Sequence, residues 1–444
     1  MVKSELSFRT SDARYVLLAI CVGVGAGSIG SVFHLAIDWS LQWPQWLATH
    51  IDGALLVVAA ALITMVCTVA AVFVVQKIAP EAGGSGVQEI EGAMEGLREV
   101  RWQRVLPVKF FAGLASIGAG LVLGREGPTI HIGASVAEGV AERAKASDLQ
   151  RRGLLAAGAA AGLACAFNAP LAAVLFVIEE TRKQFPYTFN TYMGVIAAAI
   201  MSTVMTEVIG GVAPDLALSV PQIPLALLGH FVLLGAFLGA LGVLLNRAIL
   251  TMVDAAHRWQ IRIPYVYPAI VGLVVGATVI LQPWAVTGGE TVIKEVVAAH
   301  PGIAVMLLLG VARFVTMVAS YSTGVPGGIF APILALAASF GLAFGEIAAA
   351  ITPGLDIPPL AFAICAMGGL FTSSVRAPVV GMVLILELTG AYDVTLALMI
   401  TCLTANLVAQ WLGGKPIYEQ LLDRTLALAG ITRKEPAKEP TGLA

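Results

Sequence analysis

Three glycine-rich turns stand directly before segments with helical character, and each has the composition of an anion-binding loop. They are Gly83-Gly84-Ser85-Gly86-Val87 before Gln88, Gly124-Arg125-Glu126-Gly127 before Pro128, and Gly324-Val325-Pro326-Gly327-Gly328 before Ile329. Glycine lets a backbone approach an ion closely, and the first helical turn leaves amide groups without intrahelical partners that attract anions. Ser85 would add a hydroxyl donor. One such turn could merely redirect the chain, but the three together, with Gly86 and Gly127 next to the helix starts, predict an anion site.

Glu126 lies inside the second turn, with apolar sequence on both sides. A charge in such a place costs about 2.5 to 3.5 kcal/mol on membrane-insertion scales, so an intramembrane carboxylate is a candidate for function. At an anion site the ionised carboxylate could occupy the anion's place, and protonation would free it to leave. We interpret Glu126 as a candidate gate and proton carrier; the alternative is a carboxylate that Arg125 simply neutralises.

Three more glutamates lie at the ends of apolar segments. Glu180 is followed by Thr181-Arg182-Lys183, which places it near an aqueous face where it could transfer protons; the alternative is a structural pair with Lys109, Arg182 or a backbone end. Its neighbour Glu179 and the distant Glu387 occupy corresponding positions in two similar segments. For these two, pairing with a basic residue or with a helix end is the simpler explanation.

Four further polar residues are expected to support the pathway or to play no part in it. Glu91 and Lys109 are predicted to form a buried ionic network rather than a set of direct ligands. His131, three residues after Pro128, is predicted to pack between helices instead of relaying protons. Tyr418 follows the last apolar run and offers a phenolic donor, although taken alone it is typical of an interfacial tyrosine.

The elements that position these residues are predicted to be membrane helices. Of the 444 residues 58% are hydrophobic and 12% are charged, whereas a soluble domain has roughly 25% charged residues. Apolar runs cover residues 15–37, 54–75, 192–212, 223–250, 267–281, 303–320, 330–351 and 394–411. Several match the roughly 20 residues that span hydrocarbon. The segments 154–167 and 171–178 are shorter and broken by Gly or Pro, a pattern that favours a transporter.

Basic residues indicate the orientation. Lys3, Arg9 and Arg14 precede the first apolar run, and the loop 38–52 contains neither Lys nor Arg, which favours a cytoplasmic N-terminus. The first run lacks a small-residue cleavage site after it, so we expect a retained helix rather than a signal peptide.

An internal repeat divides the chain into two halves. Asn168-Ala169-Pro170 and Arg376-Ala377-Pro378 lie 208 residues apart, each followed by an apolar helix with a glutamate ten residues after the Ala. Two halves with broken helices in corresponding places are typical of transporters whose site lies between the repeats. We predict a polytopic all-α membrane protein with the following segments: a cytoplasmic N-terminal segment 1–14, a first transmembrane repeat 15–212, a second 213–422, and a short cytoplasmic tail 423–444. These residues alone leave open whether the repeats are parallel or inverted.

Taken in order, the motifs resemble those of the CLC family of chloride channels and chloride/proton antiporters, in particular its bacterial exchangers. They are GGSG at 83–86, GREGP at 124–128, AFNAPLAAVLFVIEE at 166–180, GVPGGIFAP at 324–332 and GKPIY at 414–418. The resemblance extends over roughly residues 15–428. It implies a homodimer of inverted repeats in which each subunit has its own anion pathway.

The resemblance also implies a ligand set for chloride: the hydroxyl groups of Ser85 and Tyr418 and the amides of Ile329 and Phe330. Ser85 is similar to the serine of chloride-preferring members. One departure is clear, because Gln88 stands where the first motif usually ends in proline. Glutamine restores a backbone amide donor that proline lacks and changes the start of the helix, so the anion preference is left open.

By the same resemblance, Glu126 is the external gating glutamate and Glu180 the internal proton-transfer glutamate. Family channels usually lack a carboxylate at the second position, so Glu180 favours a H⁺/Cl⁻ antiporter over the alternative, a passive voltage- or pH-gated chloride channel with the same anion site. The predicted location is a bacterial inner membrane, with both termini in the cytoplasm. The predicted partners are chloride ions, protons, membrane lipid and a second copy of the chain.

Other classes of function find little support. The six histidines and five cysteines show no metal-ligand or catalytic spacing, so we expect no enzyme activity, metal or cofactor. A net charge of −2 without a Lys/Arg-rich stripe gives no indication of nucleic-acid binding.

Overall fold

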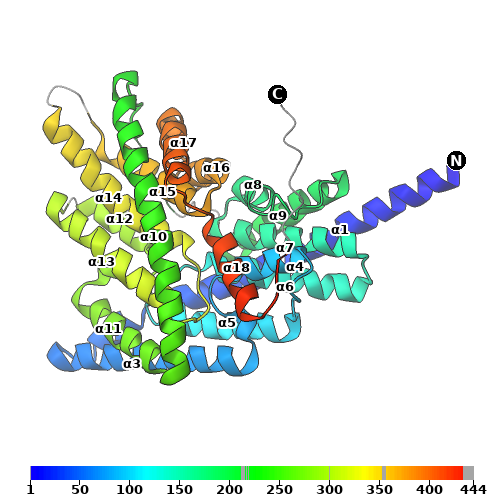
Figure 1. Cartoon of the computed structure of the whole chain (residues 1–444), viewed down its shortest axis with the longest axis horizontal. Coiled ribbons are helices and arrows are strands. Elements are labelled where there is room, and N and C mark those ends of the chain that lie inside the picture. Colours follow the sequence, from blue (N-terminus) through cyan, green and yellow to red (C-terminus); the bar gives the residue numbers. More distant parts are fainter. Residues whose placement is uncertain are drawn as a thin grey trace.

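The computed structural model describes residues 2–211, 216, 218, 220–299, 301–352 and 357–433 (Figure 1). Within these ranges the chain forms helices and turns, with two isolated bridges and no strand. The helices of the first half are α1 Val2–Ser40, α2 Trp43–Ala48, α3 Gly53–Ile78, α4 Val87–Met94, α5 Trp102–Gly118, α6 Glu126–Ala144, α7 Asp148–Phe167, α8 Pro170–Glu180 and α9 Phe189–Gly210. Those of the second half are α10 Leu228–Arg262, α11 Val266–Leu281, α12 Glu290–Ala299, α13 Ile303–Tyr321, α14 Phe330–Ile351, α15 Pro359–Val375, α16 Pro378–Thr389, α17 Thr395–Trp411 and α18 Ile417–Leu428. Short 3₁₀ turns are η1 Pro80–Ala82, η2 Leu225–Leu227, η3 Pro283–Ala285 and η4 Tyr392–Val394.

Seven helical segments of the described chain are long and apolar enough to cross a membrane. They are Asp12–Ala48, Gly53–Ile78, Phe189–Gly210, Leu225–Arg262, Ile303–Tyr321, Phe330–Ile351 and Tyr392–Trp411. Large apolar side chains point outward along these segments, for example Leu17, Leu308 and Trp411, which are 61%, 68% and 85% exposed. Such a surface suits lipid and not water. The prediction of a multi-pass membrane protein is therefore confirmed.

The two halves repeat the same packing. In the first half, α1 packs against α7 and α9, and α7 also packs against α6, α8 and α9. In the second half, α10 packs against α15 and α17, and α15 also packs against α14, α16 and α17. Thus α1 corresponds to α10, and α6, α7, α8 and α9 correspond to α14, α15, α16 and α17, in the order that the sequence repeat predicts. Between the halves, α8 packs against α16 and α3 against α11 (Figure 1). α6 also contacts α14.

Small residues bring the helices of each half close together. A methyl group added to Gly133 of α6 would lie 2.1 Å from the carbonyl oxygen of Gly158 in α7. The same close approach occurs between α14 and α15, where a methyl group on Gly341 would lie 2.6 Å from the Phe362 carbonyl oxygen. Membrane helices pack through van der Waals contact, which small residues allow over a large area.

The Ala-Pro steps explain why the short helices α8 and α16 start where they do. Asn168 ends α7 in the left-handed conformation with φ 50°, and Pro170 then begins α8. Arg376, with φ 70°, and Pro378 repeat this arrangement between α15 and α16. Asparagine tolerates the left-handed conformation, and proline fits the first helical position. Arg376 is held there by a hydrogen bond from its guanidinium group to the Asn406 carbonyl.

The predicted segment boundaries can be compared with the helix bounds. Residues 2–14 of the predicted N-terminal segment belong to α1, and the predicted boundary between 422 and 423 falls within α18. The boundary between 212 and 213 and the tail residues 434–444 lie outside the described residues.

Candidate functional site

The three glycine-rich turns meet at the centre of the molecule, where backbone hydrogen bonds join them. The amide of Gly84 donates to the Val325 carbonyl at 3.0 Å, and the Gly327 amide donates to the Gly84 carbonyl at 3.1 Å. Gly124 and Gly328 exchange two bonds of 2.8 and 2.7 Å. The first and second turns are thus both attached to the third, which belongs to the other half of the chain.

Each turn leads into a helix, as the sequence predicts. Gly86 precedes α4, Arg125 precedes α6 and Ile329 precedes α14. Gly86 has φ 94°, a conformation that glycine adopts without the strain other residues incur. His131 packs directly against it, because a methyl group on Gly86 would collide with the imidazole ring. This contact agrees with the packing role expected of His131.

Two hydroxyl groups lie at the junction where the three glycine-rich turns meet. Ser85 and Tyr418 are fully buried, and their hydroxyl groups are within reach of each other. Neither hydroxyl makes a well-aligned hydrogen bond in the described part of the chain. A methyl group on Gly127 would lie 2.5 Å from Ser85 Oγ, so the α6 terminus reaches the same point. The Phe330 and Tyr418 rings are 5.7 Å apart. The structure therefore brings Ser85, Gly127, Phe330 and Tyr418 together, including Tyr418, which the residues alone did not single out.

The side chain of Glu126 is also buried at this junction. A methyl group on Gly124 would collide with its carboxylate, and one on Gly328 would lie 3.2 Å from Oε2. Its nearest donors are the backbone amides of Glu126 and Ala331, and neither carboxylate oxygen makes a well-aligned hydrogen bond with a described residue. A buried carboxylate without such bonds is unfavourable, and it lies beside helix N-termini that favour negative charge. It has the position expected of a group that can take an anion's place.

Arg125 points toward other carboxylates. Its guanidinium group pairs with Glu290 at 3.0 Å and with Asp38 at 3.6 Å. These partners come from the start of α12 and the end of α1. The charge of Arg125 also acts on Glu126, so the alternative in which Arg125 neutralises Glu126 stays open beside these two ion pairs.

Glu180, the last residue of α8, lies against a second carboxyl group. Its side chain is within hydrogen-bonding reach of Glu91 in α4. Two carboxyl groups share a hydrogen bond only when one of them is protonated. Both line a small pocket of about 30 Å³, comparable to the volume of one water molecule in the liquid.

Charged residues surround this pocket on the side away from the junction. Lys183 donates to Glu419 at 2.8 Å, and Arg433 contacts both Glu95 and Glu419. Burial by itself raises the pKa of Glu419, but the hydrogen bond from Lys183 and the charges of Lys183 and Arg433 outweigh it and hold that pKa below its usual value. Glu419 is therefore ionised at neutral pH. No local sequence signal points to Arg433 or Glu95, because their proximity depends on the tertiary fold.

Lys109 does not join Glu91 in the ionic network that the sequence led us to expect. Its ammonium group is fully buried and donates to the carbonyls of Gly84 at 2.7 Å and Ala82 at 3.0 Å. Glu91 instead lies against Glu180. The prediction of an ionic network between Glu91 and Lys109 was wrong, because the carbonyl groups of Ala82 and Gly84 supply the acceptors for the ammonium group.

Glu179 and Glu387 each bind the start of a helix in the other half. Glu179 accepts hydrogen bonds from the amides of Val379 and Val380, at 3.4 and 2.9 Å. Glu387 accepts from Leu171 and Ala172, at 3.1 and 2.7 Å. Each carboxylate satisfies amides that the first helical turn leaves unpaired. The helix-end alternative considered for these two residues is the one that the structure shows.

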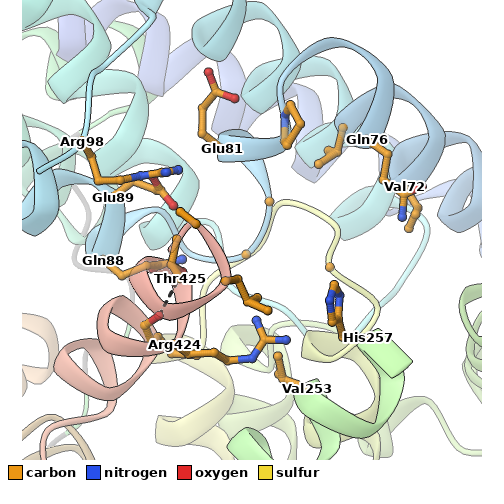
Figure 2. A pocket seen from close by; sticks show the side chains of 18 of the residues that line it. Val72, Gln76, Glu81, Gln88, Glu89, Arg98, Val253, His257, Arg424 and Thr425 are labelled. Carbon is orange, nitrogen blue, oxygen red and sulfur yellow. Dashed lines mark hydrogen bonds and ion pairs between the residues drawn. The ribbon is translucent and has the colours of Figure 1, made fainter. Parts of the chain in front are cut away.

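A large cavity of about 1050 Å³ adjoins the first turn (Figure 2). Gly83, Gly84 and Gln88 form one part of its wall, and Tyr321 and Gly324 form another. The acidic residues of the wall are paired: Arg98 binds Glu89 at 2.8 Å, and Arg104 binds Glu81 at 2.6 Å. The cavity gives a small ion access to the turn that carries Ser85.

Known proteins with the same motifs identify the family. Residues 67–410 match the family described as voltage gated chloride channel. This chain belongs to that family. Its CLC relatives include the H(+)/Cl(-) exchange transporter ClcA of Vibrio parahaemolyticus serotype O3:K6, 45% identical over 421 residues, which cover 93% of this chain and 90% of the relative. The exchanger of the same name from Vibrio cholerae serotype O1 (strain ATCC 39541) is 44% identical and covers 99% and 96%.

The CLC fold is also found by comparison of structures. The crystal structure of a slow cyanobacterial Cl⁻/H⁺ antiporter superposes with a TM-score of 0.90 at 34% identity, covering 93% of this chain and 98% of that one. The predicted all-α CLC-like fold of two inverted repeats is therefore confirmed. In the described ranges, no group of three His, Cys, Asp or Glu side chains is placed to hold a metal ion.

Proposed function

We propose that this CLC protein exchanges chloride for protons across a bacterial inner membrane. The observation that carries the proposal is the placement of buried carboxyl groups near the anion junction. Tyr418, which lies at that junction, is within electrostatic range of both Glu126 and Glu180. A pathway for chloride alone needs no second carboxyl group, whereas a pathway for protons does.

Chloride is held at the junction by neutral donors. The hydroxyl groups of Ser85 and Tyr418, which have no partner among the described residues, and the amides of Ile329 and Phe330 converge on it. The N-termini of α4, α6 and α14 add the positive ends of their dipoles. Binding by donors without a direct ion pair is strong enough to desolvate the anion and weak enough to release it.

Glu126 acts as gate and proton carrier. While ionised, its carboxylate competes with chloride for the same donors. When it gains a proton the charge is lost, the attraction to the helix termini falls, and the side chain leaves the junction. Anion entry and proton release are linked in this way through one residue.

Glu180 passes protons between Glu126 and the aqueous face beyond the small pocket. Glu91 is within hydrogen-bonding reach of Glu180 and would be the group that exchanges a proton with it. We place this face, and with it both termini, in the cytoplasm, in agreement with the basic residues before the first apolar run. We further propose that two copies of the chain assemble in the lipid as a homodimer, each with its own pathway.

The alternative function is a passive channel that uses the same anion site. Purified protein in liposomes separates the two, with the voltage set by potassium and an ionophore and a chloride gradient imposed. An exchanger moves protons against their gradient under these conditions. Chloride flux without proton movement would instead assign the chain to the channels.

A further inference from the structure

Gln88 is the residue at which this chain departs from the family's first motif, and its side chain lies against the anion-binding turn. It is the second residue of α4, is 7% exposed and forms part of the wall of the large cavity (Figure 2). Its Oε1 accepts a hydrogen bond from the Gly86 amide at 3.2 Å. The carboxamide is thus fixed on the turn that carries Ser85.

Because Oε1 is held by Gly86, the Nε2 group is the part of Gln88 that faces Gly84. A methyl group on Gly84 would lie 3.5 Å from this nitrogen and 3.3 Å from Tyr321 Oη. Lys109 donates to the Gly84 carbonyl from the other side. Hydrogen-bond donors and a positive charge therefore gather around Gly84, where the cavity meets the turn.

We propose that Gln88 is a further anion-binding residue, on the cavity side of the anion pathway. Its Nε2 group donates a hydrogen bond to a small inorganic anion that moves between the cavity and Ser85, and the bond from Gly86 to Oε1 keeps the nitrogen in position. Proline, the usual residue here, has no side-chain donor. Gln88 thus raises the affinity for chloride on the cavity side. This proposal rests on the chloride transport proposed above.

Two substitutions separate the donor from the rest of the side chain. Gln88→Glu preserves the acceptor for the Gly86 amide and replaces the Nε2 donor with a carboxylate oxygen. Gln88→Leu removes both polar atoms at similar volume. Gln76→Glu is the matched control, because Gln76 lines the same cavity and the substitution adds the same charge to the wall.

Planar bilayers containing the full-length protein allow chloride to be varied on each side separately. For Gln88→Glu we expect the KM for chloride on the cavity side to rise roughly tenfold or more, and for Gln88→Leu about threefold to tenfold, as expected for the loss of a hydrogen bond to a charged ligand. The KM on the opposite side, the maximal rate and the number of protons moved per chloride stay unchanged. Gln76→Glu changes the cavity-side KM less than about twofold, because exposed charges are screened.

Two results would overturn the proposal. One is a wild-type cavity-side KM for Gln88→Leu, and the other is an equal rise for Gln88→Glu and Gln76→Glu, which would assign the effect to the charge of the wall. Chloride binding to each purified variant, measured by calorimetry in detergent, distinguishes a lost donor from a misfolded protein. If the wild-type protein moves no chloride, the transport function itself fails, which is a different outcome from an unaltered KM in the variants.

Discussion

The ends of α8 and α16 are corresponding parts of the two halves, yet they carry different chemistry. Glu179 and Glu387 occupy equivalent positions, and each binds the helix start of the opposite half. The next residue is Glu180 in the first half and the buried Leu388 in the second. A carboxylate in a membrane helix is therefore weak evidence for proton transport by itself. The groups that it contacts, such as the amides at a helix start, have to be known before a role is assigned.

The same asymmetry occurs at the glycine-rich turns. Glu126 of the second turn corresponds in the repeat to Pro326 of the third. Both candidate proton carriers thus belong to the first half, while the second half supplies Ile329, Phe330 and Tyr418 to the anion site. Both halves therefore have a helix-capping carboxylate, Glu179 or Glu387, whereas the candidate proton carriers Glu126 and Glu180 lie only in the first half.

The largest expected effect comes from removing the charge of Glu126. Glu126→Gln can no longer release or bind a proton, so we expect proton movement in liposomes to fall to background while chloride still flows. Parallel records of pH and chloride efflux give both fluxes from the same sample. Proton pumping at the wild-type rate would remove Glu126 from the path.

Substitution of the capping carboxylates should affect stability and leave coupling intact. Glu387→Gln replaces charge-assisted bonds to two amides with weaker ones, which costs about 1 to 3 kcal/mol. We expect a lower melting temperature in detergent, with an unchanged number of protons moved per chloride. If Glu387→Gln uncoupled the two ions without altering the melting temperature, the capping role would be wrong.

The smallest effect is expected at the hydroxyl groups of the anion site. Tyr418→Phe keeps the ring contact with Phe330 and removes one donor to the anion, so chloride binding should weaken about tenfold. Calorimetric titration of the purified variant with chloride measures this change. Ser85→Ala serves as the comparison, because it removes the other hydroxyl group, and unaltered affinity in both would exclude the hydroxyl groups as ligands.

Local sequence signals predicted the parts of the site that lie within one turn. Glycine and proline mark the starts of α4, α6 and α14, and the Ala-Pro steps mark those of α8 and α16, since these residues act on the backbone directly. Tyr418 required the family resemblance, because it is brought to Ser85 by the packing of α18 and not by its neighbours in sequence.

Contacts between the halves could not be predicted from the sequence. The repeat shows that Glu179 and Glu387 correspond, but their exchange of helix starts follows from the way α8 packs against α16. Lys109 was assigned the wrong partner for the same reason. Two buried groups of opposite charge suggest a pair, and only the fold shows that backbone carbonyls of the first turn are nearer to the ammonium group.

The most direct test of the account compares two adjacent carboxylates of α8. Glu179→Gln and Glu180→Gln remove one charge each from neighbouring positions, and the fluxes of protons and chloride are measured together in liposomes under the same chloride gradient. The account predicts that Glu180→Gln moves chloride without protons, while Glu179→Gln moves both ions in the wild-type ratio. Intact coupling in Glu180→Gln, or loss of coupling in Glu179→Gln alone, would contradict it.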